Sequence, residues 1–301
     1  MSVGYTQPLS VLACDHRTSF AKLLDATWPM APAIRDEAVR FKQLVLDALV
    51  GAVRSEPSIG GAAFLVDEEL GAPAAERVHA AGILLAMPVE ASGSAEFQLE
   101  YGTAWTRHVE RFRPDLVKVL LRRHPRGDAE VRRREDARLR AVADWLDAHG
   151  HPFMFELVVP PLPSDLAGST RQRFDAEVRP SLVMEVMAGL QDSGVEPDVW
   201  KIEGLERAED CREVAAVARR GGRDDVRCIV LGRGADLGKV DHWLRAARDV
   251  DGFSGFAIGR SLWWDELVRL RAGTATEEQA VEAIAANYLH AHAVFSDRDG
   301  V

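Results

Sequence analysis

The sequence predicts an α/β protein that folds as a single (β/α)8 TIM barrel, on three observations. Short apolar runs alternate with helical patterns along all 301 residues. The runs number eight, and eight strand–helix units close naturally into a cylinder of parallel strands. After the first run the chain reads Asp15-His-Arg-Thr-Ser19. An open doubly wound sheet, the second choice, would place a glycine-rich turn there.

Each of the eight runs has the length and apolar content of a buried strand. We expect strands, in chain order, at Leu9–Cys14, Ala62–Val66, Ile83–Val89, Leu116–Leu121, Phe153–Val159, Val199–Glu203, Val226–Leu231 and Phe256–Ile258.

Amphipathic stretches between the runs supply the helices. The stretch Ile34–Val53 places Ala38, Phe41 and Val45 on one face, at helical spacing. Further helices are expected at Glu130–His149, Arg179–Ser193 and Thr276–Phe295. No linker or composition break divides the chain, so we expect one domain over residues 1–301, with a tail that frays from about Ser296.

Composition excludes several classes of protein. The net charge of −10 argues against a nucleic-acid partner, because a phosphate backbone needs a basic face. No apolar run is long enough to span a membrane, and the N-terminus shows no secretion signal. The three cysteines have no CxxC spacing, so neither a disulfide framework nor a zinc site is expected. These features are typical of a cytoplasmic protein.

Lysine is rare and unusually placed. Five lysines stand against 32 arginines, and Lys118 and Lys201 lie inside predicted strands. A lysine in a strand is commonly an ion-paired residue. Arginine stays protonated, however, whereas a desolvated lysine can lose its proton near neutral pH and attack a carbonyl. The pair therefore indicates imine chemistry.

The predicted strand ends bring further chemistry to the same place, since barrels carry their active sites at the carboxyl ends of the strands. Alternation puts Lys118 and Arg122 on one face of the fourth strand, and Lys201 and Glu203 on one face of the sixth. Glu156 lies on the strand between them, where a carboxylate can pass protons. A second ammonium group also lowers the pKa of a neighbouring amine. Glu203 serves equally well as the structural partner of an arginine.

Candidate substrate-binding residues occupy the remaining strand ends. Loops after strands 7 and 8 of a barrel often bind phosphate through backbone N–H groups, and arginine adds a bidentate fork. The residues at these positions are Gly232, Arg233, Gly234, Gly259 and Arg260. Arg122 is placed to bind a second anion. After the first strand, Asp15 and His16 either bind substrate groups or form a buried ion-pair hub with Arg17. Arg17 and Glu90, which follows the third strand, are further candidates for substrate binding.

Several motifs together resemble the DUF2090 family, over roughly residues 8 to 295. They are Leu12-Ala-Cys-Asp-His-Arg17, Pro88-Val-Glu-Ala-Ser-Gly93 with Glu100-Tyr-Gly102, Val117-Lys-Val-Leu120, Trp200-Lys-Ile-Glu-Gly-Leu-Glu206, Ile229-Val-Leu-Gly-Arg-Gly-Ala-Asp236 and Gly255-Phe-Ala-Ile-Gly-Arg260. The family includes the aldolase module fused to a sugar kinase in bacterial myo-inositol catabolism. The resemblance implies 2-deoxy-5-keto-gluconate 6-phosphate aldolase activity, giving dihydroxyacetone phosphate and malonate semialdehyde.

A more distant likeness is to the class I tagatose-1,6-bisphosphate aldolases. It implies that Lys201 forms the imine, with Lys118 as the second lysine and Glu156 as the proton-transferring carboxylate. The early aspartate of that family matches Asp15, and its late phosphate contact matches Gly259-Arg260. The loop after the seventh strand departs from the family, because Gly232-Arg-Gly234 replaces a more serine-rich turn.

The working hypothesis is a cofactor-free and metal-free class I aldolase that acts on a sugar phosphate and forms a homo-oligomer. Three alternatives stay open. One is an aldolase for another sugar phosphate or a sulfosugar phosphate. Another is a metal-dependent aldolase or isomerase that uses Asp15, His16, Glu90 and Glu203 as ligands for magnesium or manganese. The last is a non-catalytic barrel that binds a sugar phosphate.

Overall fold

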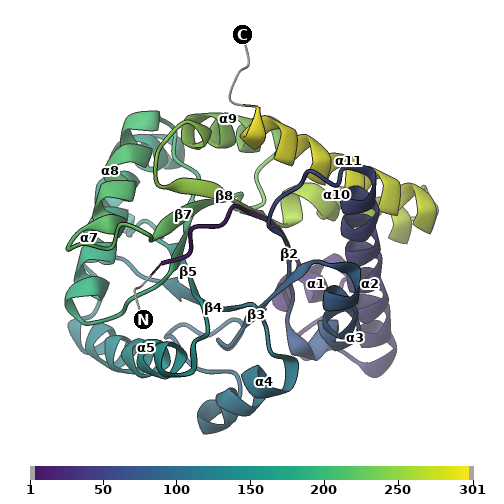
Figure 1. Cartoon of the computed structure of the whole chain (residues 1–301), viewed down its shortest axis with the longest axis horizontal. Coiled ribbons are helices and arrows are strands. Elements are labelled where there is room, and N and C mark those ends of the chain that lie inside the picture. Colours follow the sequence, from purple (N-terminus) through teal and green to yellow (C-terminus); the bar gives the residue numbers. More distant parts are fainter. Residues whose placement is uncertain (1–3, 298–301) are drawn as a thin grey trace.

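The computed structural model describes residues 4–297 and shows a closed barrel of eight parallel strands (Figure 1). The strands are β1 (Leu9–Ala13), β2 (Ala62–Leu65), β3 (Leu84–Pro88), β4 (Leu116–Arg122), β5 (Phe153–Val158), β6 (Val199–Glu203), β7 (Arg227–Leu231) and β8 (Phe253–Ile258). They are arranged in sequence order, and β1 pairs with both β2 and β8, so the sheet has no free edge. The predicted TIM barrel is confirmed.

The predicted strand bounds hold to within a residue or so, except in β8. That strand begins at Phe253, three residues before the predicted Phe256. The sequence Ser254-Gly255 interrupts the apolar run and hides the start of the strand. Gly255 belongs there because a Cβ atom would lie 1.8 Å from the carbonyl oxygen of Leu9 on β1, so only glycine lets these two strands approach.

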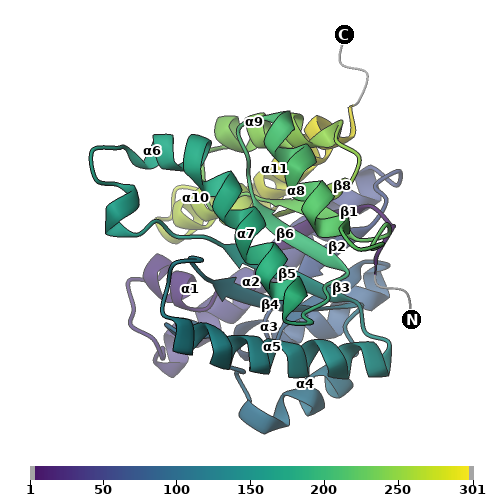
Figure 2. The ribbon, with the colours of Figure 1, turned by 90° about the vertical axis from the view of Figure 1, so that its left-hand side faces the viewer.

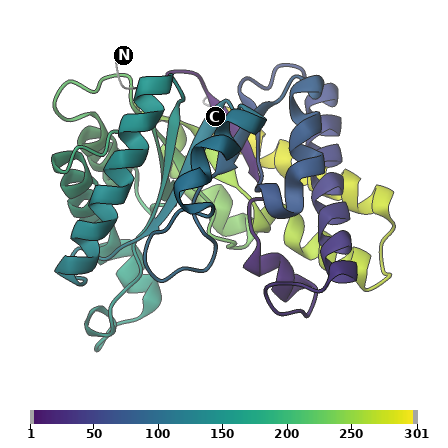
Figure 3. The same ribbon diagram turned by 90° about the horizontal axis from the view of Figure 1, so that it is seen from below.

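Helices surround the barrel on the outside (Figures 1 and 2). They are α1 (Thr18–Leu23), α2 (Pro32–Ser55), α3 (Glu68–Val78), α4 (Trp105–Phe112), α5 (Ala129–His149), α6 (Arg171–Arg173), α7 (Arg179–Asp192), α8 (Ala208–Arg219), α9 (Leu237–Arg248), α10 (Arg260–Arg271) and α11 (Glu277–Ser296). The four predicted helices correspond to α2, α5, α7 and α11. Figure 3 shows α2 beside α11, where the first and last long helices pack together.

Side-chain caps fix where several helices begin. Asp67 accepts a hydrogen bond from the backbone N–H of Leu70 at the start of α3, and Asp236 accepts one from the backbone N–H of Lys239 at the start of α9. Thr276 and Gln279 form a reciprocal capping box that starts α11. Ser296 is the last residue of α11, and most of the predicted frayed tail (298–301) lies outside the described residues. None of the described helices combines the length and apolar character needed to cross a membrane.

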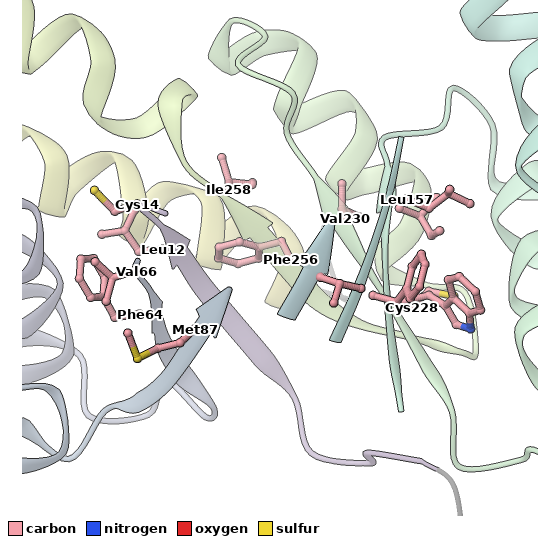
Figure 4. Packing of buried hydrophobic residues seen from close by; sticks show 14 of the residues in the cluster. Leu12, Cys14, Phe64, Val66, Met87, Leu157, Cys228, Val230, Phe256 and Ile258 are labelled. Carbon is pink, nitrogen blue, oxygen red and sulfur yellow. The ribbon is translucent and has the colours of Figure 1, made fainter. Parts of the chain in front are cut away.

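Two apolar layers make up the core. The outer layer lies between the strands and the helices, and Figure 4 shows part of it, including Leu12, Phe64 and Phe256. The inner layer fills the interior of the barrel below the carboxyl ends of the strands. Its members are Leu9, Val11, Ala13, Ala63, Leu65, Ala86, Leu116, Met154, Val199, Ile229 and Ala257. Because side chains alternate along a strand, the next inward positions lie at the carboxyl end, above this apolar layer.

Candidate active site

A cavity of about 660 Å³ opens at the carboxyl ends of the strands. Of the residues predicted from the sequence, those that line it are Asp15, His16, Arg17, Glu90, Lys118, Arg122, Glu156, Lys201, Glu203, Arg233, Gly234, Gly259 and Arg260. Gly232 does not line the cavity. Positions alternate along this segment, so Leu231 and Arg233 face the cavity and position 232 faces outward. A Cβ atom at Gly232 would lie 3.0 Å from the side chain of Ile258.

The charged residues at the floor of the cavity continue the inward rows of the inner core. Lys118 follows Leu116 on β4, and Lys201 follows Val199 on β6. Glu156 follows Met154 on β5 and pairs in register with Lys201. The alternation expected from the sequence therefore brings both lysines and the glutamate to one level of the barrel interior.

Lys118 lies at the centre of three carboxylates. Its Nζ atom is 2.8 Å from Asp15 Oδ2, 2.7 Å from Glu90 Oε1 and 2.9 Å from Glu156 Oε2. Burial alone would lower the pKa of Lys118, but the three negative charges outweigh burial and raise it above its usual value. Lys118 therefore stays an ammonium group at neutral pH and holds the acidic cluster together.

The surroundings of Lys201 differ from those of Lys118. Lys201 is 2% exposed, and its Nζ atom lies 3.0 Å from Glu156 Oε2, the same oxygen that Lys118 contacts. Burial acts to raise the pKa of Glu156, but the two ammonium groups outweigh it and lower the pKa to about 2. One carboxylate oxygen is thus shared between two amines, and Lys201 has no second acidic partner among residues 4–297.

The other two carboxyl groups differ in their ionisation. Burial opposes the charge of Asp15, yet Lys118 and Lys201 together lower its pKa well below the usual range. Burial dominates at Glu90 and raises its pKa. Only Oε1 of Glu90 receives a hydrogen bond, from Lys118, and the buried Oε2 has none.

His16 and Arg17 take up separate positions beside Asp15. The His16 ring packs edge-on against Trp263, and burial lowers its pKa to about 4, so it is neutral at physiological pH. Arg17 donates one hydrogen bond of 2.6 Å to Glu100 and another of 2.9 Å to the backbone oxygen of Glu90. Arg17 therefore fastens the loop after β3 to the end of β1.

Arg260 and the loop after β7 form the side of the cavity opposite β4. Arg260 Nη2 donates a 2.8 Å hydrogen bond to the backbone oxygen of Arg233, while its buried Nε has no partner. Gly234 has φ +75°, and a Cβ atom there would lie 2.9 Å from the Arg260 guanidinium. At Gly259 a Cβ atom would lie 2.3 Å from the backbone oxygen of Ala13. The glycines thus leave room for an arginine that still has free N–H donors.

Glu203 belongs to an ion-pair network rather than to the lysine cluster. It lies 2.9 Å from Arg233 Nε and accepts a 2.9 Å hydrogen bond from the backbone N–H of Val159. The fully buried Arg179 lies 3.6 Å from it. Asp175 contacts both Arg233 and Arg179, at 3.0 and 3.1 Å. Sequence reasoning gave neither Arg179 nor Asp175 a role in the site, because both lie on helical segments that are distant in sequence from any strand end.

A third buried lysine was also missed. Lys42 on α2 is fully buried and is ion-paired with Asp67, which follows β2. It also donates to the backbone oxygens of Cys14 and His16, at 2.6 and 2.9 Å. The two carbonyl groups flank Asp15, so Lys42 fixes the backbone that carries this carboxylate. The detectable signal was a lysine at an apolar position of an amphipathic helix, next to Phe41.

Comparison with solved structures finds similar folds, two of them in fructose-bisphosphate aldolases. The fructose-bisphosphate aldolase from Slackia heliotrinireducens aligns with a TM-score of 0.58 and 13% identity, over 98% of this chain and 87% of the other. The Plasmodium falciparum fructose-bisphosphate aldolase, solved with TRAP and a small-molecule inhibitor, aligns with a TM-score of 0.65 and 12% identity, over 100% and 99%. At such identities the likeness establishes the fold alone.

Among curated proteins the comparison finds no match. The family comparison does find one: the model for "Uncharacterized protein conserved in bacteria (DUF2090)" matches residues 4–299. This span includes every motif on which the sequence resemblance rested. The chain therefore belongs to the DUF2090 family.

Proposed function

We propose that the protein is a class I aldolase in which Lys201 forms an imine with the ketone of a phosphorylated keto sugar or keto acid. One observation carries the proposal: Lys118 is surrounded by three carboxylates, whereas Lys201 shares a single carboxylate oxygen with it. The ammonium form of Lys118 is strongly favoured, so Lys201 is the amine that can act as a nucleophile.

The arrangement of Glu156 suits the proton transfers. When Lys201 attacks the ketone, its proton passes to Glu156, whose Oε2 lies 3.0 Å away. The same carboxyl group then returns a proton to the hydroxyl of the carbinolamine, which leaves as water. Glu156, ionised again after this transfer, then removes the proton of the hydroxyl on the far side of the scissile bond, and the electrons of that carbon–carbon bond move into the protonated imine. Protonation and hydrolysis of the resulting enamine restore Lys201.

The phosphate would bind at Arg260. Its Nε atom has no partner, and the loop containing Gly234 leaves the backbone accessible beside it. An arginine fork with adjacent backbone N–H groups suits a phosphate, and contacts remote from the reacting bond orient the substrate.

The substrate we propose is 2-deoxy-5-keto-gluconate 6-phosphate, cleaved to dihydroxyacetone phosphate and malonate semialdehyde. The resemblance of its motifs to the aldolase module of the DUF2090 family, to which the chain belongs, supports this choice. Another sugar phosphate or a sulfosugar phosphate would use the same chemistry. A metal-dependent reaction is less well supported, because Asp15 and Glu90 hold Lys118 while Glu203 holds arginines.

Borohydride trapping tests the proposal. Incubation with dihydroxyacetone phosphate and borohydride should leave a reduced adduct on Lys201, located by peptide mass spectrometry. Lys201→Met should abolish the adduct, whereas Lys239→Met, at a lysine on α9 away from the cavity, should keep it. An adduct on Lys118 would reverse the two roles, and no adduct on either lysine would reject the mechanism and leave the metal-dependent and binding-protein alternatives.

A further inference from the structure

The turn after β7 holds an arginine in a backbone conformation that suits glycine. The backbone N–H of Ala235 donates a 3.0 Å hydrogen bond to the oxygen of Gly232, which closes a four-residue turn. Both central residues, Arg233 and Gly234, have positive φ, at +56° and +75°. Turns of this kind favour glycine, asparagine or aspartate at the centre, because a Cβ atom is strained at positive φ. The side chain of Arg233 must therefore make interactions that offset the strain.

Two carboxylates hold that side chain. Arg233 Nε lies 2.9 Å from Glu203 Oε1, and Arg233 Nη1 donates a 3.0 Å hydrogen bond to Asp175 Oδ2. Two of the three guanidinium nitrogens are thus committed to acidic partners, which already neutralise the charge of Arg233. The sequence predicts Arg233 as a phosphate ligand, but an arginine in this state is poorly available to a further anion.

Asp175 is itself anchored. It lies on the π-helical segment Phe174–Val178, a rare kind of element that is frequent at functional sites. Its Oδ1 atom lies 3.1 Å from Nε of the fully buried Arg179, which in turn lies 3.6 Å from Glu203. Glu203 ends β6, the strand that carries the nucleophilic amine. The side chain of Arg233 is thus tied to that strand.

The turn also forms the seat of Arg260. The backbone oxygen of Arg233 accepts a 2.8 Å hydrogen bond from Arg260 Nη2. Gly234 packs so closely that a Cβ atom there would lie 2.9 Å from the guanidinium carbon of Arg260, whose buried Nε atom has no hydrogen-bond partner. The direction of the free donors of this planar group therefore depends on where the turn places the carbonyl of Arg233.

We propose that Arg233 is a positioning residue and not a ligand of the phosphate. Its ion pairs with Glu203 and Asp175 hold the strained turn, and the turn presents the backbone oxygen that orients Arg260. The inference rests on the proposed function and assigns to Arg233 a role that acts through its backbone. It follows that the guanidinium of Arg233 can be dispensed with, provided that residue 233 tolerates positive φ.

Replacement of Arg233 separates the two roles. The initial rate of borohydride trapping on Lys201 is followed against the concentration of dihydroxyacetone phosphate, and the half-saturating concentration measures binding of the donor. Arg233→Gly and Arg233→Asn tolerate positive φ and should stay within about threefold of the wild type. Arg233→Ala loses the ion pairs and keeps the strain, so it should raise the half-saturating concentration about tenfold or more. Dihydroxyacetone, which lacks the phosphate, should label all four proteins alike.

Asp175→Asn tests the ion pairs from their other end. It should raise the half-saturating concentration of dihydroxyacetone phosphate about tenfold when made alone. It should change that concentration little when combined with Arg233→Gly, because glycine holds the turn without ion pairs. Glu177→Gln is the matched control, since Glu177 lies on the same π-helical segment, is 59% exposed and pairs with an exposed arginine. It should behave as the wild type.

Three outcomes would contradict the inference. Equal losses of about tenfold in all three Arg233 variants, with labelling by dihydroxyacetone unchanged, would identify Arg233 as a phosphate ligand and leave the aldolase proposal standing. The inference also fails, again without touching that proposal, if Arg233→Ala or Asp175→Asn binds dihydroxyacetone phosphate as the wild type does. No adduct on Lys201 of the wild type with either compound would overturn the proposed function and this inference with it.

Discussion

Replacing Glu156 by glutamine probes the feature that the site depends on most, the carboxylate shared between two amines. The fall in the pKa of Glu156 from 4.5 to about 2 corresponds to about 3 kcal/mol of stabilisation of the folded protein at neutral pH. Glutamine cannot ionise, so Glu156→Gln should lower the free energy of unfolding at pH 7 by about this amount. It should also lower kcat by about 10²-fold or more, if the carboxyl group moves protons.

The sign of the pH dependence follows from the direction of the change. A carboxyl group whose pKa is lower in the folded state stabilises that state above pH 4.5, and this contribution is lost as the pH falls from 4.5 towards 2. The difference in free energy of unfolding between wild type and Glu156→Gln should therefore shrink over that range.

Urea unfolding at pH 7 and at pH 4 and below measures the difference, with Glu130→Gln as the control. Glu130 is 67% exposed on α5 and pairs with an exposed arginine, so its replacement should change stability by less than about 0.5 kcal/mol. A loss below about 1 kcal/mol for Glu156→Gln at pH 7, or a loss that does not depend on pH, would refute the electrostatic reasoning.

Three further outcomes are expected from buried groups. Lys118→Met leaves its acidic partners without their cation and should cost about 3–5 kcal/mol in urea unfolding, with part recovered when Glu90→Gln is added. Lys42→Met should cost a similar amount and lower kcat, whereas Lys239→Met, at a partly exposed position, should change the free energy of unfolding by less than about 1 kcal/mol. Thiol reagents at pH 8 should label no cysteine of the native protein, since burial raises the pKa of Cys14 to about 12 and all three cysteines are buried; labelling before unfolding in urea would contradict this.

Much of the barrel could be predicted because its strands are short, apolar and evenly alternated with helices. The period of two along β4 and β6 was enough to place Lys118 and Lys201 on the inner face, and closure in sequence order then brought Glu156 between them. Gly232 was expected at the cavity because it belongs to the loop after the seventh strand; the period of two was not applied there, although Gly232 alternates with Leu231 and Arg233 and so faces away from the cavity.

The parts that escaped prediction depend on contacts between distant segments. Lys42 and Asp67 are 25 residues apart, and their pairing appears only when α2 packs beside the ends of β1 and β2. Which lysine holds more carboxylates could not be read from the sequence either. That answer needs the distances from Lys118 to Asp15 and Glu90, which come from strands on either side of β2.

The distribution of the five lysines has a practical consequence. Lys42, Lys118 and Lys201 are at most 2% exposed, while Lys22 is exposed and Lys239 is partly exposed. Amine-directed coupling, biotinylation and tryptic nicking at lysine would therefore act on the native protein at these last two side chains. Lys22 lines the cavity, so attachment to a solid support through amines can obstruct the entrance. α5 begins at the cavity, which its Glu135 lines, and runs away from it, so attachment through a cysteine introduced near its C-terminal end, at the 63% exposed Asp144, leaves the entrance clear.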